Sequence, residues 1–123
     1  MNAQKIQPVE FVISRQFTET WKNLEYDDDD LFVLQDQILA WPKRAPVISG
    51  TGGVRKLRFA ARRRKMGKRG GTRVAYVYFE HHEKVVLAIA YAKTAKRDLL
   101  SWEKKALKSA VETWDQEFQK KQS

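Results

Sequence analysis

The first third of the chain carries apolar residues in two different patterns. A continuous apolar run at residues 11–13 predicts a short strand, because strands are short and rich in β-branched and aromatic residues. After Ser14, the residues Phe17, Trp21 and Leu24 recur at spacings of four and three. That spacing predicts a helix with one buried stripe, and Ser14 is expected to cap its N-terminus.

A second helix is predicted directly after the consecutive aspartates at residues 27–30, because acidic side chains stabilise the N-terminal end of a helix dipole. Proline cannot continue a helix, so this one is expected to end at Trp41-Pro42. The aspartate run also has the composition of a metal ligand set. The sequence offers no paired ligands elsewhere, and we predict neither a metal nor another cofactor. Within this second helix, the residues expected to face the core are Leu31, Leu34, Gln35, Ile38 and Leu39.

Three strand-like runs follow, at residues 54–60, 72–79 and 85–92. They are rich in Val, Tyr, Ile and Phe, and they show the alternation typical of strands. A loop rich in glycine and arginine at residues 61–71 separates the first two runs, and a tight polar turn at residues 80–83 separates the last two. The three runs are therefore expected to form a meander.

A C-terminal helix completes the predicted order, and Ser101 is expected to cap it. The order β-α-α-β-β-β-α keeps strands and helices in separate groups. It predicts a single α+β domain over residues 1–123, with two N-terminal helices and one C-terminal helix on a small, mostly antiparallel four-stranded sheet. The last helix is expected to bury one face that repeats every four residues, at Trp102, Ala106, Ala110, Trp114 and Phe118.

Charge is distributed unevenly along this order. The net charge is +9, yet residues 1–36 carry three basic and eight acidic residues. Residues 37–79 carry twelve basic residues and no acidic one, and residues 80–123 carry nine basic and seven acidic residues. This segregation favours a nucleic acid or another polyanion as the partner of the central segment, with general solubility as the alternative explanation.

Composition narrows the class of protein further. The chain contains no cysteine, which excludes disulfides, cysteine metal sites and a cysteine nucleophile. No apolar run is long enough to span a membrane, and the N-terminus lacks the apolar core of a signal peptide. We therefore expect a cytoplasmic protein without membrane contact, and its high charge favours a monomer.

Pairing of the predicted strands brings basic residues together. If the turn at residues 80–83 is centred roughly on residue 82, antiparallel pairing sets Arg73 opposite Tyr91. Side chains alternate along a strand, so Lys56 and Arg58 share one face while their apolar neighbours face the core. The candidate catalytic residues are Lys56, Arg58, Arg73, Tyr91 and Lys93.

This set has the chemistry to hold a phosphodiester. Arginine offers two-pronged contact to phosphate, and lysine is the cation whose pKa can fall when other cations crowd it. Such a lysine can take the proton from a 2′-hydroxyl, and Tyr91 can stack on a base or exchange a proton. Sheet tyrosines more often serve a core or a stacking surface, however, and cations on a sheet more often bind than react.

Other titratable residues are interpreted structurally. His81 and His82 fall at the opposite end of the hairpin from Tyr91, about nine residues of strand away. They are therefore expected to be solvated turn residues rather than a catalytic pair. Asp98 and Glu103 are expected to be capping and dipole partners of the last helix.

Two glycine-framed basic strings resemble a known family. Residues 47–58 read VISGTGGVRKLR, and residues 67–73 read GKRGGTR. They are followed by YVY, IAYAK and DL at residues 76–78, 89–93 and 98–99. Over about residues 8–115 the chain resembles the HigB branch of the RelE-type toxins of bacterial toxin–antitoxin systems, and the fold of that family agrees with the predicted order.

The resemblance implies an endoribonuclease that cleaves mRNA in the ribosomal A site by attack of the 2′-hydroxyl. It also implies two partners, the ribosome and a HigA-like helix-turn-helix antitoxin. Lys56 and Arg58 match basic positions on the second strand of the family, Arg73 matches its phosphate-binding arginine, and Lys93 matches the basic end of its last strand. The C-terminal tyrosine of RelE has no counterpart, since residues 99–102 read LLSW. Either Tyr91 substitutes for it or the reaction proceeds without it.

The central loop is more basic than a nuclease centre requires, and we expect it to dock on ribosomal RNA. One alternative is a nucleic-acid-binding module without catalysis, including a toxin relative that binds only its antitoxin and operator. A second alternative is a relative that acts on a protein such as a topoisomerase. The set Lys56, Arg58 and Arg73 argues against this alternative. The candidate RNA-binding residues are Arg55, Arg62, Arg63, Arg64, Lys65, Lys68 and Arg69.

Overall fold

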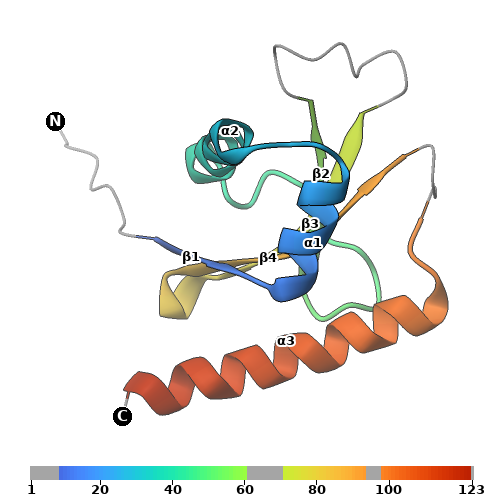
Figure 1. Ribbon diagram of the computed structural model, residues 1–123. Coiled ribbons are helices and arrows are strands. Elements are labelled where there is room, and N and C mark those ends of the chain that lie inside the picture. The colour runs from blue at the N-terminus through green and yellow to red at the C-terminus, as the bar shows by residue number, and fades with distance from the viewer. Residues whose placement is uncertain (1–8, 61–70, 94–97, 123) are drawn as a thin grey trace, which may run out of the picture.

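A four-stranded sheet with helices on both faces makes up the computed structural model, which describes residues 9–60, 71–93 and 98–122 (Figure 1). A short 3₁₀ turn, Glu80–His82, joins the last two strands. The observed order confirms the predicted α+β class and the order β-α-α-β-β-β-α. The elements are β1 (Glu10–Ile13), α1 (Arg15–Asn23), α2 (Asp28–Ala40), β2 (Val54–Phe59), β3 (Thr72–Phe79), β4 (Lys84–Ala92) and α3 (Ser101–Gln122).

The strands lie in the order β1-β4-β3-β2. Strands β2, β3 and β4 form the predicted antiparallel meander, and β1 joins β4 in parallel. The pairing of β3 with β4 shifts by one residue, because Ala75 pairs with Ile89 whereas Tyr76 pairs with Leu87. Ala88 is therefore the extra residue of a β-bulge in β4.

Helix α1 stabilises the bulged part of β4. Ser14, the N-cap of α1, donates from its hydroxyl to the carbonyl of Ala88 over 2.8 Å, and its backbone N–H donates to the carbonyl of Leu87 over 3.1 Å. Thr20 Oγ1 accepts a hydrogen bond of 3.1 Å from the backbone N–H of Ala90. These contacts satisfy backbone groups of β4 beyond the end of β1.

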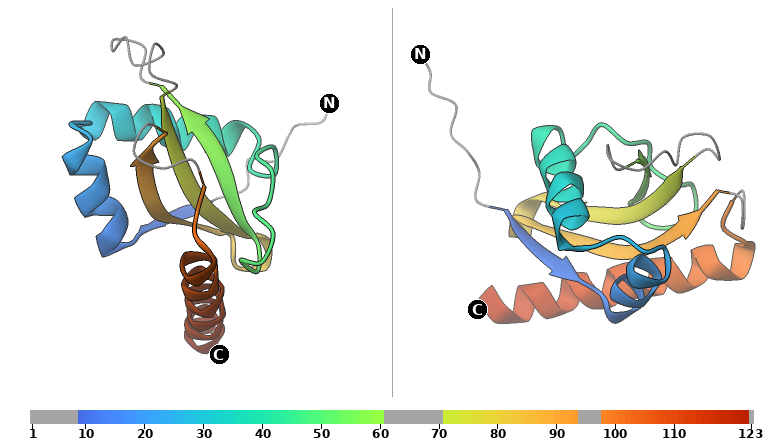
Figure 2. Two further views of the ribbon diagram at one scale, coloured as in Figure 1. Left: turned by 90° about the vertical axis from the view of Figure 1, so that its right-hand side faces the viewer. Right: turned by 45° about the horizontal axis from the view of Figure 1, so that its top comes forward.

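Helices α1 and α2 cover one face of the sheet and α3 covers the other (Figure 2). An apolar core lies on each face. On one face, Phe17 and Trp21 of α1 and Leu34 and Ile38 of α2 pack against the sheet, which confirms the two predicted stripes at these residues. Leu39, expected in the second stripe, is 43% exposed. On the other face, α3 packs against the sheet through residues that include Val111 and Phe118.

Side chains cap the N-termini of the first two helices, and the cap at Ser14 was predicted. The Ser14 hydroxyl accepts from the backbone N–H of Phe17 over 3.0 Å. At α2, Asp27 and Asp30 form a capping box, in which each carboxylate accepts from the backbone N–H of the other residue, over 2.9 and 3.0 Å. The aspartate run therefore starts this helix as predicted.

The buried stripe of α3 differs from the predicted one. Trp102 is 66% exposed, and Ala106 is also exposed. A step of four residues turns an α-helix by about 40° more than one full turn, so a repeat of four alone winds around the helix. The face that packs on the sheet alternates steps of four and three instead, at Leu107, Val111, Trp114 and Phe118.

Within the described ranges, no helix is both long and apolar enough to cross a membrane.

Candidate functional site

A row of three polar side chains crosses the sheet where β2 ends and β3 begins. Arg58 on β2 lies opposite Arg73 on β3, and Arg73 lies opposite Tyr91 on β4. The predicted pairing of Arg73 with Tyr91 is confirmed. The register next to the turn would have set Ala90 opposite Arg73, and the bulge at Ala88 supplies the one residue that brings Tyr91 into the row.

The row lies on the α3 side of the sheet, because Ala75 and Ile89, the next residues on that face, belong to the core beneath α3. Arg73 is only 6% exposed and Tyr91 only 7%, whereas Arg58 on the edge strand is exposed. Burial therefore increases from the edge strand inward. A ligand would meet Arg58 first and the other two side chains at greater depth.

Lys56 extends the row along β2 and contacts an acid. Its Nζ lies 3.2 Å from Oδ1 of Asp98, a residue just before α3. Asp98 and Glu103 were both expected to serve the helix terminus. The prediction is confirmed for Glu103, whose Oε1 accepts from the backbone N–H of Leu100 over 2.8 Å. One signal in the sequence pointed to Asp98: it is the only acid between residues 84 and 102.

The phenol of Tyr91 is held in its neutral form. Burial is the main cause that raises its pKa above the ordinary value, and the negative charges of Asp98 and Glu103 raise it further. The guanidinium of Arg73 opposes them and lowers the pKa, but the net direction is upward. A neutral phenol can donate a proton or a hydrogen bond at neutral pH, and it is a poor base.

The remaining candidates lie elsewhere. Lys93 follows the end of β4; its backbone N–H donates to the carbonyl of Gly71 over 3.2 Å, and the residue is exposed. Arg55 lies on the opposite face from Lys56 and donates from Nη1 to the carbonyls of two residues before β2, as described below. The basic residues of the loop, Arg62, Arg63, Arg64, Lys65, Lys68 and Arg69, lie outside the described residues.

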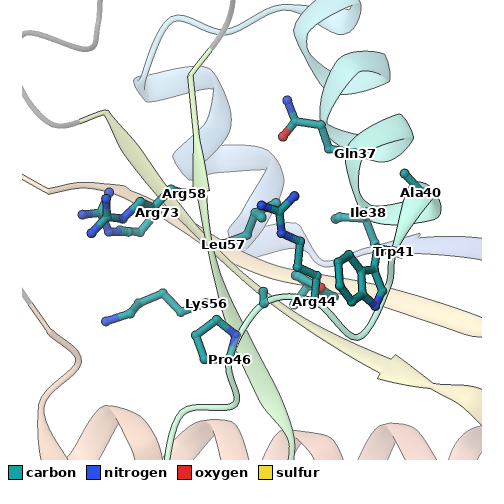
Figure 3. Close-up of a pocket in the computed structure, with 12 residues that line it drawn as sticks. Gln37, Ile38, Ala40, Trp41, Arg44, Pro46, Lys56, Leu57, Arg58 and Arg73 are labelled. Atoms are coloured by element: carbon teal, nitrogen blue, oxygen red, sulfur yellow. The ribbon is translucent and has the colours of Figure 1, made fainter.

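A groove of about 750 Å³ runs past the row and over the edge strand β2. Figure 3 shows Lys56, Arg58 and Arg73 on one side of β2, with Trp41 and Arg44 on the other. The groove therefore joins the cationic row to the segment that follows α2. Its lining residues are Gln37, Ile38, Ala40, Trp41, Arg44, Ala45, Pro46, Lys56, Leu57, Arg58, Arg73 and Tyr76.

The prediction that both histidines are solvated was wrong for His82. His81 is exposed, but His82 is only 9% exposed, and its Nε2 lies 2.9 Å from Oδ1 of Asp115 on α3. The rings of Phe79 and Phe118 pack around it, with centroids 6.1 and 5.6 Å away. This histidine therefore attaches the 3₁₀ turn to α3.

The row can bind a phosphodiester and place a proton donor beside it. Two guanidiniums and an ammonium can pair with phosphate oxygens, and the neutral phenol can protonate a leaving oxygen. Among the residues that the structure describes, no three His, Asp or Glu side chains converge to hold a metal ion.

The described elements define a small α+β domain of the RelE-like fold. No family model matches the chain. A solved structure that it resembles is Escherichia coli toxin RelE in the free state, a mutant in which two arginines are replaced by alanine. The TM-score is 0.51 at 13% sequence identity, over 73% of this chain and 88% of that one. The similarity confirms the fold implied by the resemblance, and the HigB branch stays a prediction.

Proposed function

We propose that the chain is a toxin of the RelE type, in its HigB branch, and that it cleaves mRNA in the ribosomal A site. The observation that carries the proposal is the row Arg58–Arg73–Tyr91, with Lys56 beside it, on one face of the sheet. Three cations and a neutral phenol at one place are better suited to bind a phosphodiester than to bind a protein.

The proposed reaction joins the 2′-oxygen to phosphorus and breaks the bond between phosphorus and the 5′-oxygen. Arg58 and Arg73 hold the non-bridging oxygens and stabilise the charge that grows on them. Tyr91 gives its proton to the departing 5′-oxygen. Asp98, which the structure places against Lys56, accepts the proton of the 2′-hydroxyl. The products are a 2′,3′-cyclic phosphate and a free 5′-hydroxyl.

Inducible expression tests the cleavage. Wild-type protein is expected to arrest growth and to leave cuts with cyclic phosphate ends in translated messages. Arg58→Ala and Arg73→Ala each remove a phosphate donor and are expected to lower the cleavage rate by about 10²–10³-fold. Arg15→Ala is the matched control, because Arg15 is a guanidinium on α1 with its side chain 92% exposed.

Circular dichroism of each variant separates loss of chemistry from loss of folding, which matters most for the buried Arg73. Well-folded Arg58→Ala and Arg73→Ala proteins that arrest growth as strongly as wild type would contradict the proposal. So would a wild-type protein that arrests growth without cutting messages.

Dependence on the ribosome is tested with purified components. The protein is expected to cut mRNA on programmed ribosomes and to leave naked RNA largely intact. Efficient cutting of naked RNA contradicts ribosome dependence but not nuclease activity. The proposed partner that neutralises the toxin is a helix-turn-helix antitoxin encoded next to it, and co-expression of that neighbour is expected to restore growth.

A further inference from the structure

Trp41 is a large aromatic side chain that the fold leaves in solvent. It is 61% exposed, and it follows the last residue of α2 in an extended conformation, with its backbone N–H on the carbonyl of Ile38. The indole lines the same groove as Arg58 and Arg73, on the other side of β2 (Figure 3). Tryptophan is enriched at binding interfaces, because its large ring contacts a partner while its N–H can still find a hydrogen-bond acceptor.

The turn that presents Trp41 is held in place from the sheet. The hydroxyl of Tyr76 on β3 donates to the carbonyl of Pro42 over 2.6 Å. Arg55 on β2 donates from Nη1 to the carbonyls of Lys43 and Ala45 over 2.9 and 2.7 Å. The indole is therefore carried by a segment with little freedom to move, and binding to it costs little ordering entropy.

A cation accompanies the ring. The guanidinium carbon of Arg44 lies 5.8 Å from the centroid of Trp41, and both residues line the same groove as Arg58 and Arg73. All four charged residues in the lining of this groove, as far as the structure describes it, are basic. A flat ring flanked by cations, within a groove lined by further cations, is the composition of a single-stranded nucleic-acid channel.

We propose that Trp41 and Arg44 form a subsite for the unpaired mRNA nucleotide next to the scissile phosphate, which rests on the proposed function. The base stacks on the indole, and Arg44 contacts the phosphate of the same nucleotide. The path over the edge of β2 keeps this nucleotide in one groove with the phosphate held by Arg58 and Arg73 (Figure 3).

Binding of an uncleavable RNA hexamer tests the subsite without requiring catalysis. Its 2′-hydroxyls are methylated so that none can attack phosphorus, and affinity is read from the anisotropy of a terminal fluorescein. Trp41→Ala is expected to weaken binding by about 5- to 150-fold, the range for loss of one stacked base, whereas Trp41→Phe keeps most of the affinity. Phe32→Ala, which removes an aromatic of 63% exposure from α2, is the matched control and leaves affinity unchanged.

Two further measurements identify the contacts. Arg44→Gln is expected to reduce the slope of log affinity against log salt by about 0.7, the value for one phosphate contact on a single strand, while Trp41→Ala leaves that slope unchanged. An abasic residue placed at successive positions of the hexamer weakens wild-type binding at one position. At that position the abasic residue leaves the affinity of Trp41→Ala unchanged, because this variant lacks the indole on which the missing base would stack.

An affinity of Trp41→Ala equal to wild type overturns the subsite, as does a wild-type protein that fails to bind the hexamer at low salt. Equal losses in the alanine and phenylalanine variants, without coupling to the abasic position, also overturn it, because they indicate a structural role. If the groove holds a protein partner instead, RNA affinity does not respond to Trp41. A wild-type protein that cuts no messages contradicts the proposed nuclease and leaves this binding result standing.

Discussion

Arg55 offers a direct comparison between a structural role and an RNA-binding role. The sequence groups it with the loop cations, whereas the structure directs its guanidinium to the turn between α2 and β2. Nη1 donates to the exposed carbonyl of Lys43 over 2.9 Å and to the partly buried carbonyl of Ala45 over 2.7 Å. Removal of the exposed bond is expected to cost about 0.5 kcal/mol and removal of the partly buried one about 1.5 kcal/mol.

Arg55→Ala is therefore expected to lower the free energy of unfolding by about 2 kcal/mol. Urea denaturation followed by circular dichroism measures this change. Arg44→Ala is the control: its guanidinium lies 5.8 Å from the ring of Trp41, an exposed contact worth about 0.5 kcal/mol. If Arg55→Ala unfolds at the wild-type urea concentration but binds RNA more weakly, the structural role is refuted and the RNA contact is supported.

Two further predictions concern Tyr91 and Gly71. The raised pKa of Tyr91 means that its unfolded form ionises first, so stability falls as pH rises from about 10 toward the native value. Tyr91→Phe is expected to lose less stability than wild type over this range in urea titrations, and parallel losses would contradict the assignment. Gly71 has a φ of 72°, and a Cβ there would lie 3.1 Å from the carbonyl oxygen of Phe59. Gly71→Ala is expected to cost about 2 kcal/mol or more, against about 1 kcal/mol for Gly50→Ala, whose φ is 83° and whose added Cβ meets no described atom. Equal costs in denaturation would show that the contact with Phe59 contributes nothing.

Local patterns were sufficient for most of the fold. The spacing of Phe17 and Trp21 predicts α1, and the alternation in residues 72–79 predicts β3, because each pattern reflects the period of its element. Alternation also places Lys56 and Arg58 on one face. These predictions depend only on near neighbours in the sequence, and the helix and strand periods determine them.

Contacts between segments far apart in the sequence could not be predicted from local patterns. The absence of other acids between residues 84 and 102 singles out Asp98, but it does not indicate that the carboxylate meets Lys56. Nothing near His82 in the sequence indicates that Asp115 lies beside it. The proposed binding role of Trp41 also depends on such contacts. Pro42 indicates in the sequence that a helix ends here, but nothing in the sequence indicates that Trp41 lines a groove. The function of Arg55 needs the position of the turn at residues 42–45, which the sequence leaves open.

The bulge at Ala88 makes the arrangement of the candidate site sensitive to the length of β4 at a residue that does not belong to that site. Deletion of Ala88 would let β4 pair regularly and keep Tyr91 opposite Arg73. Insertion of one residue between Ala88 and Ala90, by contrast, would turn Tyr91 toward α1 and set Ala90 opposite Arg73, because side chains alternate along β4. The polypeptide would keep every residue of the candidate site and lose its arrangement. A single-residue insertion in this apolar strand is therefore expected to inactivate the protein as completely as replacement of an arginine.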